Sequence, residues 1–171
     1  MQRQADDYPA AAASSQQALS LFGDLRDLRS QAYALNELGM VQQLTGDHPS
    51  AAASHQQALA LNRDVGNRHG QAETLNCLGE LASRTADGRQ ARDHHTQALA
   101  IAREIGTPLE QARALEGIGH SHLRDGHASE GTACLEQALA IYQHIAPPAA
   151  RRVQETLLQH RQDNLAPTPK R

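Results

Sequence analysis

The sequence predicts an all-α solenoid, in which pairs of antiparallel helices stack along one axis. The first observation is a repeat: the tripeptide Gln-Ala-Leu starts at residues 17, 57, 97 and 137, so it returns every 40 residues. The second is that each repeat holds two stretches with the hydrophobic spacing of an amphipathic helix. The third is composition: aromatic residues make up 2% of the 171-residue chain, so Ala and Leu must build the core. A fixed period of this length is the signature of stacked repeats.

Each repeat contains a first and a second helix. In the first, Leu75, Leu78 and Ala82 recur at i, i+3 and i+7, which places them on one face. In the second, His95 and Ala102 share a face in the same way. In chain order we expect helices at residues 9–22, 28–45, 49–64, 68–85, 89–104, 108–124, 128–145 and 148–162.

Residues that favour helix starts stand at fixed places in the repeat. Their side chains can accept a hydrogen bond from the unpaired N–H groups of the first turn. The column before the first helix is Asp27, Asn67 and Thr107, and the column before the second is Asp7, Asp47 and Asp87. Thr107, Pro108 and Glu110 form the pattern of a capping box with proline at the first helical position. Gly46 and Gly126 mark turns between helices.

Glycine stands in the middle of the first helix of every full repeat, at Gly39, Gly79 and Gly119. Glycine there costs roughly 1 kcal/mol relative to alanine. Because this cost returns at one column, we expect the two helices of a repeat to approach closely at that point. Ala51 and Ala91 of the second helix are expected to face the same contact.

These columns resemble the tetratricopeptide repeat (TPR), a helix–turn–helix unit with a small residue where its helices touch. The matching positions are Leu35, Leu38, Gly39, Ala51 and Ala58, then Leu75, Leu78, Gly79, Ala91 and Ala98, then Leu115, Ile118, Gly119, Gly131 and Ala138. The resemblance covers about residues 7–146. Its period, longer than the usual one of about 34 residues, is similar to a subfamily that includes cell-polarity adaptors of the LGN type. That subfamily also includes the TPR arrays of actinobacterial transcriptional regulators and NB-ARC-type ATPases.

The resemblance implies a right-handed superhelix of about 3.5 repeats with a C-terminal capping helix. Where the family usually has a large aromatic in the second helix, this chain has His55, His95 and Leu135, and the usual proline at the end of that helix is absent. We therefore expect looser packing and a longer second helix.

The array is expected to span residues 1–163 as one domain. Its parts are a half repeat at 7–24, repeats at 27–64, 67–104 and 107–145, and a capping helix at 148–162. Residues 164–171, which contain two prolines, are expected to be a disordered tail. Because residues 7–24 align with a second helix, we expect either a piece of a longer array or an open N-terminal end that a second chain covers.

Composition narrows the functional class. The formal net charge is −3, which makes direct nucleic-acid binding unlikely because such domains usually carry a basic face. No apolar run is long enough to cross a membrane, and the first residues lack the apolar segment of a secretory signal. Two cysteines make no disulfide framework. We therefore expect a cytoplasmic protein.

The resemblance also implies a concave groove, lined by the first helices, that binds a peptide or a segment of a partner protein. The residues expected to face the groove are Tyr33, Asn36, Glu37, Met40, Gln43, Glu73, Asn76, Glu80, Arg84, Arg113, Glu116, His120 and Arg124. Its charge is mixed, being acidic at Glu37 and Glu73 and basic toward Arg113 and Arg124. This polarity could orient a ligand with an acidic end near the C-terminal repeats, or it could be an ordinary solvated face.

Asn36 and Asn76 stand where many peptide-binding members of the family use a ladder of asparagines. A side-chain amide offers a donor and an acceptor together, which suits the backbone of an extended peptide. Glu116 replaces the third rung. Two asparagines making two bonds each supply roughly 2–6 kcal/mol, so we expect micromolar affinity at best. The alternative interpretation is that both amides are solvated or bridge helices.

The sequence gives no pattern for catalysis or for metal binding. The histidines lack the i, i+4 pairing of a zinc site, and His94 and His95 are adjacent and so diverge on a helix. Cys77 has Glu73 and Glu80 one turn away, and acidic neighbours raise the pKa of a thiol. We expect no enzyme activity, no metal and no cofactor.

The function expected from these features is protein–protein interaction through the groove. The resemblance adds a role as the regulatory or sensor arm of a bacterial transcriptional regulator. Two alternatives remain open: a structural module that forms homo-oligomers through its open N-terminal half repeat, and a domain that senses a small molecule.

Overall fold

The computed structural model describes residues 7–85 and 87–165. Eight α-helices and no strand lie in these two ranges, which confirms the prediction of an all-α solenoid. The helices are α1 (Asp7–Asp24), α2 (Leu28–Thr45), α3 (His48–Asp64), α4 (Arg68–Arg84), α5 (Gly88–Glu104), α6 (Pro108–Arg124), α7 (Ala128–Ile145) and α8 (Pro147–Leu165). Every predicted helix end lies within three residues of the observed one.

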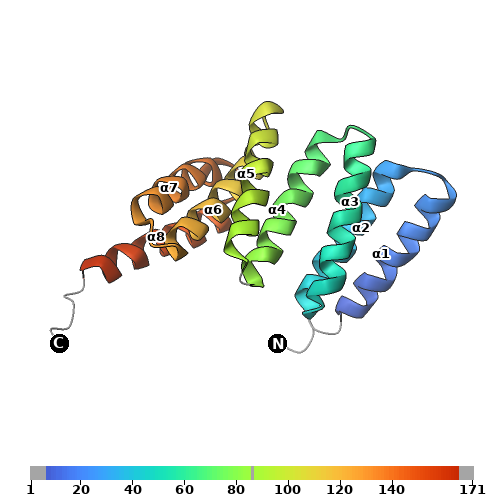
Figure 1. The fold of residues 1–171 in the computed structure, drawn as a ribbon, viewed down its shortest axis with the longest axis horizontal. Helices are drawn as coiled ribbons and strands as arrows, with labels where there is room; N and C mark the ends of the chain where they lie inside the picture. Colours follow the sequence, from blue (N-terminus) through green and yellow to red (C-terminus); the bar gives the residue numbers. More distant parts are fainter. Residues whose placement is uncertain (1–6, 86, 166–171) are drawn as a thin grey trace.

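The helices form a row of antiparallel pairs, α2 with α3, α4 with α5 and α6 with α7 (Figure 1). Helix α1 packs on α2 at one end of the row, and α8 packs on α7 at the other. The first helices of successive pairs also touch, since α4 contacts both α2 and α6. Of the helices described, none has both the length and the apolarity that a membrane crossing needs.

Four of the six predicted helix caps are observed, and the predicted Asp7 instead lies within α1. Asp27, Asp47, Asn67 and Asp87 each accept a hydrogen bond from the backbone N–H three residues on, as an N-cap does. Thr107 does not, because its hydroxyl donates to the backbone carbonyl at the end of α5, 3.4 Å away. The predicted capping box is therefore wrong. The carboxylate of Glu110, three residues after Thr107, is free for another contact.

Two glycine turns lie where the sequence predicts them, and the last helix runs slightly beyond its predicted end. Gly46 and Gly126 adopt φ of 85° and 82°, the left-handed conformation that favours glycine after a helix. Helix α8 begins at Pro147 and continues to Leu165, so the first two residues of the predicted tail are helical. The rest of that tail, residues 166–171, lies outside the described residues.

The glycine column marks a close approach between helices, as predicted, but the partner side chains differ from the expected alanines. A Cβ at Gly39 would lie 2.7 Å from the ring of His55, and one at Gly79 would lie 2.6 Å from the ring of His95. In the third repeat a Cβ at Gly119 would lie 2.8 Å from Leu135. Histidine and leucine thus fill the space beside the glycines because these are the larger side chains on the second helix.

His95 is enclosed from two sides. Besides Gly79 of α4, it lies against Gly117 of α6, where a Cβ would come within 2.3 Å of its ring. The side chain is 1% exposed. The ring therefore joins its own repeat to the next one. Further along, Leu115, Tyr142 and Val153 extend a continuous core into α8.

We expect Gly79→Ala to destabilise the fold by about 1–3 kcal/mol, even though alanine gains up to about 1 kcal/mol of helix propensity. The added Cβ would collide with the His95 ring, which has no room to move because Gly117 lies against its other side. Urea unfolding followed by circular dichroism measures the change.

Gly88→Ala is the matched control. Gly88 also lies in a helix, but a Cβ there would meet no heavy atom within 4 Å. This variant should be as stable as the wild type or more stable. Equal effects from the two substitutions would contradict the close-packing account.

Candidate functional site

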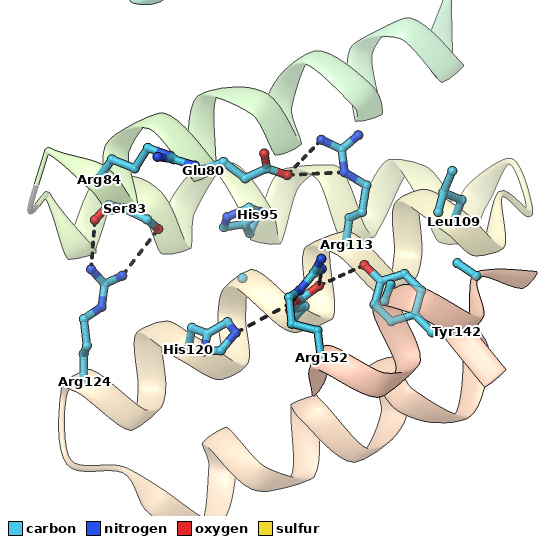
Figure 2. A pocket seen from close by; sticks show the side chains of 14 residues that line it. Glu80, Ser83, Arg84, His95, Leu109, Arg113, His120, Arg124, Tyr142 and Arg152 are labelled. Carbon is cyan, nitrogen blue, oxygen red and sulfur yellow. Dashed lines mark hydrogen bonds and ion pairs between the residues drawn. The ribbon is translucent and has the colours of Figure 1, made fainter. Parts of the chain in front are cut away.

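A cavity of about 760 Å³ opens in the C-terminal half of the array (Figure 2). Most of its lining comes from first helices, α4, α6 and α8, with contributions from α5, α7 and the turn that follows α7; we call it the α4–α6–α8 cavity. The lining residues are Glu80, Ser83, Arg84, His95, Leu109, Arg113, Glu116, Gly117, His120, Arg124, Tyr142, Ala146, Ala149 and Arg152. Its volume lies within the range of about 300–1,000 Å³ that is typical of ligand sites.

Two ion pairs cross the cavity between neighbouring helices. Arg113 of α6 donates to Glu80 of α4 at 2.8 Å and also contacts Glu110 at 3.3 Å. Arg152 of α8 donates to both carboxylate oxygens of Glu116, at 2.9 and 3.0 Å. Both pairs tie one repeat to the next, so these four charged groups stabilise the cavity walls.

Three side chains contact the carboxylate of Glu116. Burial opposes its ionisation, but hydrogen bonds from His120, Arg152 and the Tyr142 hydroxyl outweigh that effect and lower its pKa to about 2. The carboxylate is therefore charged at every physiological pH. The same contact raises the pKa of Tyr142, together with burial of its ring.

The other two arginines have no carboxylate partner within the described residues. Arg124 donates to the backbone carbonyl of Ser83 at 3.2 Å and to its hydroxyl at 3.4 Å, and both of these acceptors are neutral. Arg84 is exposed and makes no ion pair with any described residue. With four arginines and two glutamates the lining carries a formal charge of +2, whereas the whole chain carries −3.

The cavity has a cationic end and an apolar end. Arg84 and Arg124 stand at the C-terminal ends of α4 and α6, while Leu109 stands near the N-terminus of α6 beside Tyr142 (Figure 2). Leu109 is 48% exposed. From Leu109 to Arg124 the helix rises about 22 Å, which is the length of roughly six to seven residues of extended chain.

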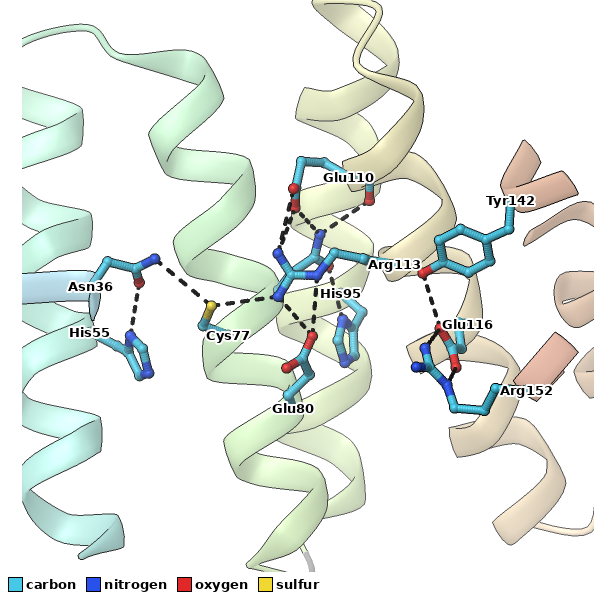
Figure 3. A network of polar contacts seen from close by, with 11 residues as sticks. Asn36, His55, Cys77, Glu80, His95, Glu110, Arg113, Glu116, Tyr142 and Arg152 are labelled. Carbon is cyan, nitrogen blue, oxygen red and sulfur yellow. Dashed lines mark hydrogen bonds and ion pairs between the residues drawn. The ribbon is translucent and has the colours of Figure 1, made fainter. Parts of the chain in front are cut away.

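The two predicted rungs of the asparagine ladder do not face this cavity or any open groove. Asn36 is 2% exposed and Asn76 is 0% exposed. Figure 3 shows Asn36 between His55 and Cys77. The amide oxygen of Asn36 accepts from Nδ1 of His55 at 2.9 Å, and that of Asn76 accepts from Nδ1 of His95 at 3.1 Å. The interpretation as exposed rungs is corrected, and the alternative that they bridge helices describes the structure.

The amide nitrogens of both asparagines are used as well. Asn36 donates toward Sγ of Cys77 in the next repeat, at 3.9 Å. Asn76 donates to the backbone carbonyl of Glu110 at 3.1 Å and to its carboxylate at 2.8 Å. Each asparagine therefore joins a histidine of its own repeat to the first helix of the following one. The physical reason is that close packing leaves the buried histidines without water, so a side chain must supply their partner.

Burial also sets the protonation of the histidines and of Cys77. Removal from water lowers the pKa of His55 from 6.5 to about 4, and it lowers that of His95 to about 4 as well. Burial raises the pKa of Cys77 to about 11, although the nearby Arg113 opposes the shift. The thiol is therefore protonated and enclosed. The described residues hold no group of three or more side chains that could bind a metal ion.

Six of the predicted groove residues line the cavity: Glu80, Arg84, Arg113, Glu116, His120 and Arg124. The remaining ones besides the asparagines lie outside it. Tyr33 is 60% exposed on α2, Glu37, Met40 and Glu73 are half-buried, and Gln43 is buried. Burial raises the pKa of Glu37, and burial with the nearby Glu110 raises that of Glu73.

Leu109, Tyr142 and Arg152 are among the cavity residues that had no predicted binding role. Tyr142 falls in the same column as Phe22, Asn62 and Ala102, so an aromatic residue at that column was the available signal. Arg152 lies on α8, which was interpreted only as a cap.

Part of the chain is similar to a known repeat family. Residues 70–144, which run from α4 into α7, match the tetratricopeptide repeat model. A comparison with curated protein sequences found no match. The repeats that carry the cavity are thus those that match the family model.

Solved structures share the fold. BtubC (BKLC) from P. vanneervenii superposes with a TM-score of 0.70 at 19% identity over 97% of this chain, and the chain spans 62% of that structure's length. A Podosopora anserina protein described as a kinesin light chain with nearly identical TPR-like repeats gives a TM-score of 0.71 at 18% identity, covering 94% of this chain and 81% of the other. Its Q17M form gives 0.72 at 17% identity, covering 94% and 80%.

Stability should fall as the pH drops from about 6.5 to about 4. His55 and His95 have a pKa of about 4 in the fold and 6.5 when exposed, so the unfolded chain binds more protons in this window. Each histidine should remove up to about 3 kcal/mol of the free energy of unfolding, all of it lost by about pH 4. Urea unfolding across this pH range measures the slope.

The variant His55→Phe keeps an aromatic ring beside Gly39 but cannot take up a proton. Its stability should depend less steeply on pH over the same window. A slope unchanged from the wild type would show that His55 is not the group responsible.

Proposed function

We propose that this chain, whose residues 70–144 match the tetratricopeptide repeat model, is a non-catalytic interaction module that binds an extended, acidic segment of a partner protein in the α4–α6–α8 cavity. The observation that carries this proposal is the pair Arg84 and Arg124, two guanidinium groups at one end of the cavity with no carboxylate partner among the described residues. An acidic side chain or a C-terminal carboxylate of the partner would form ion pairs with these two groups, because guanidinium pairs strongly with carboxylate.

The rest of the cavity fits the same ligand. Leu109 and the alanines of the α7–α8 turn offer an apolar contact at the far end. The segment would lie along α6 with its acidic group toward Arg124, at a length of about six to seven extended residues. Since Arg113 and Arg152 already have carboxylate partners, Arg84 and Arg124 would be the residues that bind the negative charge of the ligand.

Binding should be modest in strength. Exposed charge pairs contribute about 0.2–1 kcal/mol each, and ordering a free segment has its own cost. We therefore expect micromolar affinity that weakens as salt is added. This range suits a module that samples partners reversibly.

A second candidate is a small molecule with an anionic group, since the cavity volume is that of a typical small-ligand site. A rise in melting temperature with small anionic metabolites and no peptide binding would favour it. The resemblance to the longer-period subfamily also favours a role as the regulatory arm of a bacterial transcriptional regulator in the cytoplasm. Identification of a partner would test that role.

A library of random heptapeptides, displayed on phage and selected on the immobilised protein, tests the proposal. Selected peptides should be enriched in Asp and Glu near one end, and Arg84→Ala combined with Arg124→Ala should lower their affinity by about two- to thirtyfold. The substitutions remove the cationic end without touching either ion pair that holds the helices.

Arg89→Ala combined with Arg103→Ala is the control, because it removes the same two charges from exposed positions of α5 outside the cavity. It should leave binding close to that of the wild type. No acidic enrichment, or equal losses in the double variant and the control, would reject the cavity as the binding site.

A further inference from the structure

The ring of His95 lies at the inner side of the α4–α6–α8 cavity (Figure 2). Gly79 of α4 and Gly117 of α6 lie against the ring, so it sits between two of the helices that line the cavity. The side chain is 1% exposed, and yet it is part of the cavity lining. A ligand in the cavity would therefore meet this ring.

The hydrogen bonds around His95 determine which ring nitrogen carries the proton. The amide nitrogen of Asn76 donates to the backbone carbonyl and the carboxylate of Glu110, so the amide oxygen is the atom that lies 3.1 Å from Nδ1 of His95. Nδ1 is therefore the donor. Burial lowers the pKa of His95 to about 4, so at pH 7 the neutral ring holds this one proton only. Nε2 is left as an acceptor with a free lone pair.

Nε2 of His95 accepts no hydrogen bond from any residue that the structure describes. The arginines nearby donate elsewhere, Arg113 and Arg152 to carboxylates and Arg124 to Ser83. A nearly buried acceptor without a donor costs free energy. A ligand that brings a donor to this point would remove that cost.

The preceding repeat has the same histidine but not the same access. Nδ1 of His55 donates to Asn36 at 2.9 Å, and Nε2 of His55 is buried without a partner. The residue in the column of Gly117 is there Cys77, whose side chain is itself buried. At Gly117 a Cβ alone would come within 2.3 Å of Nε2 of His95. Glycine at this column therefore leaves open a position that any side chain would cover.

We propose that His95 selects partner segments with a hydroxyl side chain, that of Ser, Thr or Tyr, whose O–H donates to Nε2. This inference rests on the proposed function, since it concerns the same segment in the same cavity. The lining carries a formal charge of +2, which disfavours the cationic donors Lys and Arg. A hydroxyl is the smallest neutral donor, which suits an acceptor on a ring that is 1% exposed.

The position of the hydroxyl in the segment follows from the length of α6. Gly117 and Arg124 are separated by about 10 Å along the helix axis. An extended chain covers that distance in about three residues. The hydroxyl residue should therefore stand about three positions from the acidic group that pairs with Arg84 and Arg124.

The heptapeptides selected on the full chain test this proposal. They should carry Ser, Thr or Tyr about three positions from the acidic end. A synthetic peptide of this sequence should bind about two- to tenfold more tightly than its partner peptide, in which Ala, Val or Phe replaces Ser, Thr or Tyr. Equal affinities of the two peptides for the wild type would overturn the inference.

The variant His95→Phe keeps a ring beside Gly79 and Gly117 but offers no acceptor. It should bind both peptides equally, whereas a purely structural role of His95 would weaken both by the same factor and keep the preference. His55→Phe is the matched control, because it makes the same change in the preceding repeat, outside the cavity lining. It should prefer the hydroxyl peptide as the wild type does. A preference that persists in His95→Phe would overturn the inference.

The nitrogen resonance of Nε2 gives a second measurement that needs no substitution in the protein. Accepting a hydrogen bond moves the resonance of an imidazole nitrogen upfield. The resonance of His95 Nε2 should move with the hydroxyl peptide and not with its partner peptide, while that of the buried His55 Nε2 should move with neither. An unmoved His95 resonance would overturn the inference even if His95→Phe did not fold.

Failure of this inference and failure of the proposed function give different results. Acidic peptides that bind in the cavity without a hydroxyl preference would overturn the role of His95 and leave the proposed function in place. Peptides without acidic enrichment, or peptides whose binding does not depend on Arg84 and Arg124, would reject both.

Discussion

The structure depends on one close contact, between the glycine of each first helix and one side chain of the second helix. In two repeats that side chain is a histidine, and its ring fills the space that a Cβ would need. A ring in such a place is cut off from water, so its nitrogen requires a protein partner. Asn36 and Asn76 provide it. The way the helices pack therefore determines which polar groups remain free for recognition, and these two asparagines are not among them.

The repeat pattern was enough to predict the helices, four helix caps and the glycine contact, because each follows from local chemistry that returns at a fixed spacing. The direction of Asn36 and Asn76 could not be predicted in this way. A residue at that column can face solvent or the neighbouring repeat, and the choice depends on how closely successive repeats approach. The sequence signal for their direction was the histidine at the column of the second helix where the family usually has an aromatic residue. A buried histidine carries a ring N–H that needs a hydrogen-bond acceptor.

The cavity was only partly predictable, for a different reason. Glu80, Arg113 and Arg124 lie on repeated first helices, so their side of the array followed from the period. Arg152 lies on α8, after Pro147 and Pro148 have broken the 40-residue spacing. Without a column to align with, its contact with Glu116 has no trace in the sequence.

Because α8 supplies one wall of the cavity, the site belongs to the end of the array and not to the repeat itself. Inserting another 40-residue unit ahead of α4 would leave every lining residue in place, since all of them come from α4 and the segments after it. Inserting one between α7 and α8 would separate Arg152 from Glu116 and dismantle the wall. Growth of this protein by repeat duplication is therefore compatible with its cavity only on the N-terminal side.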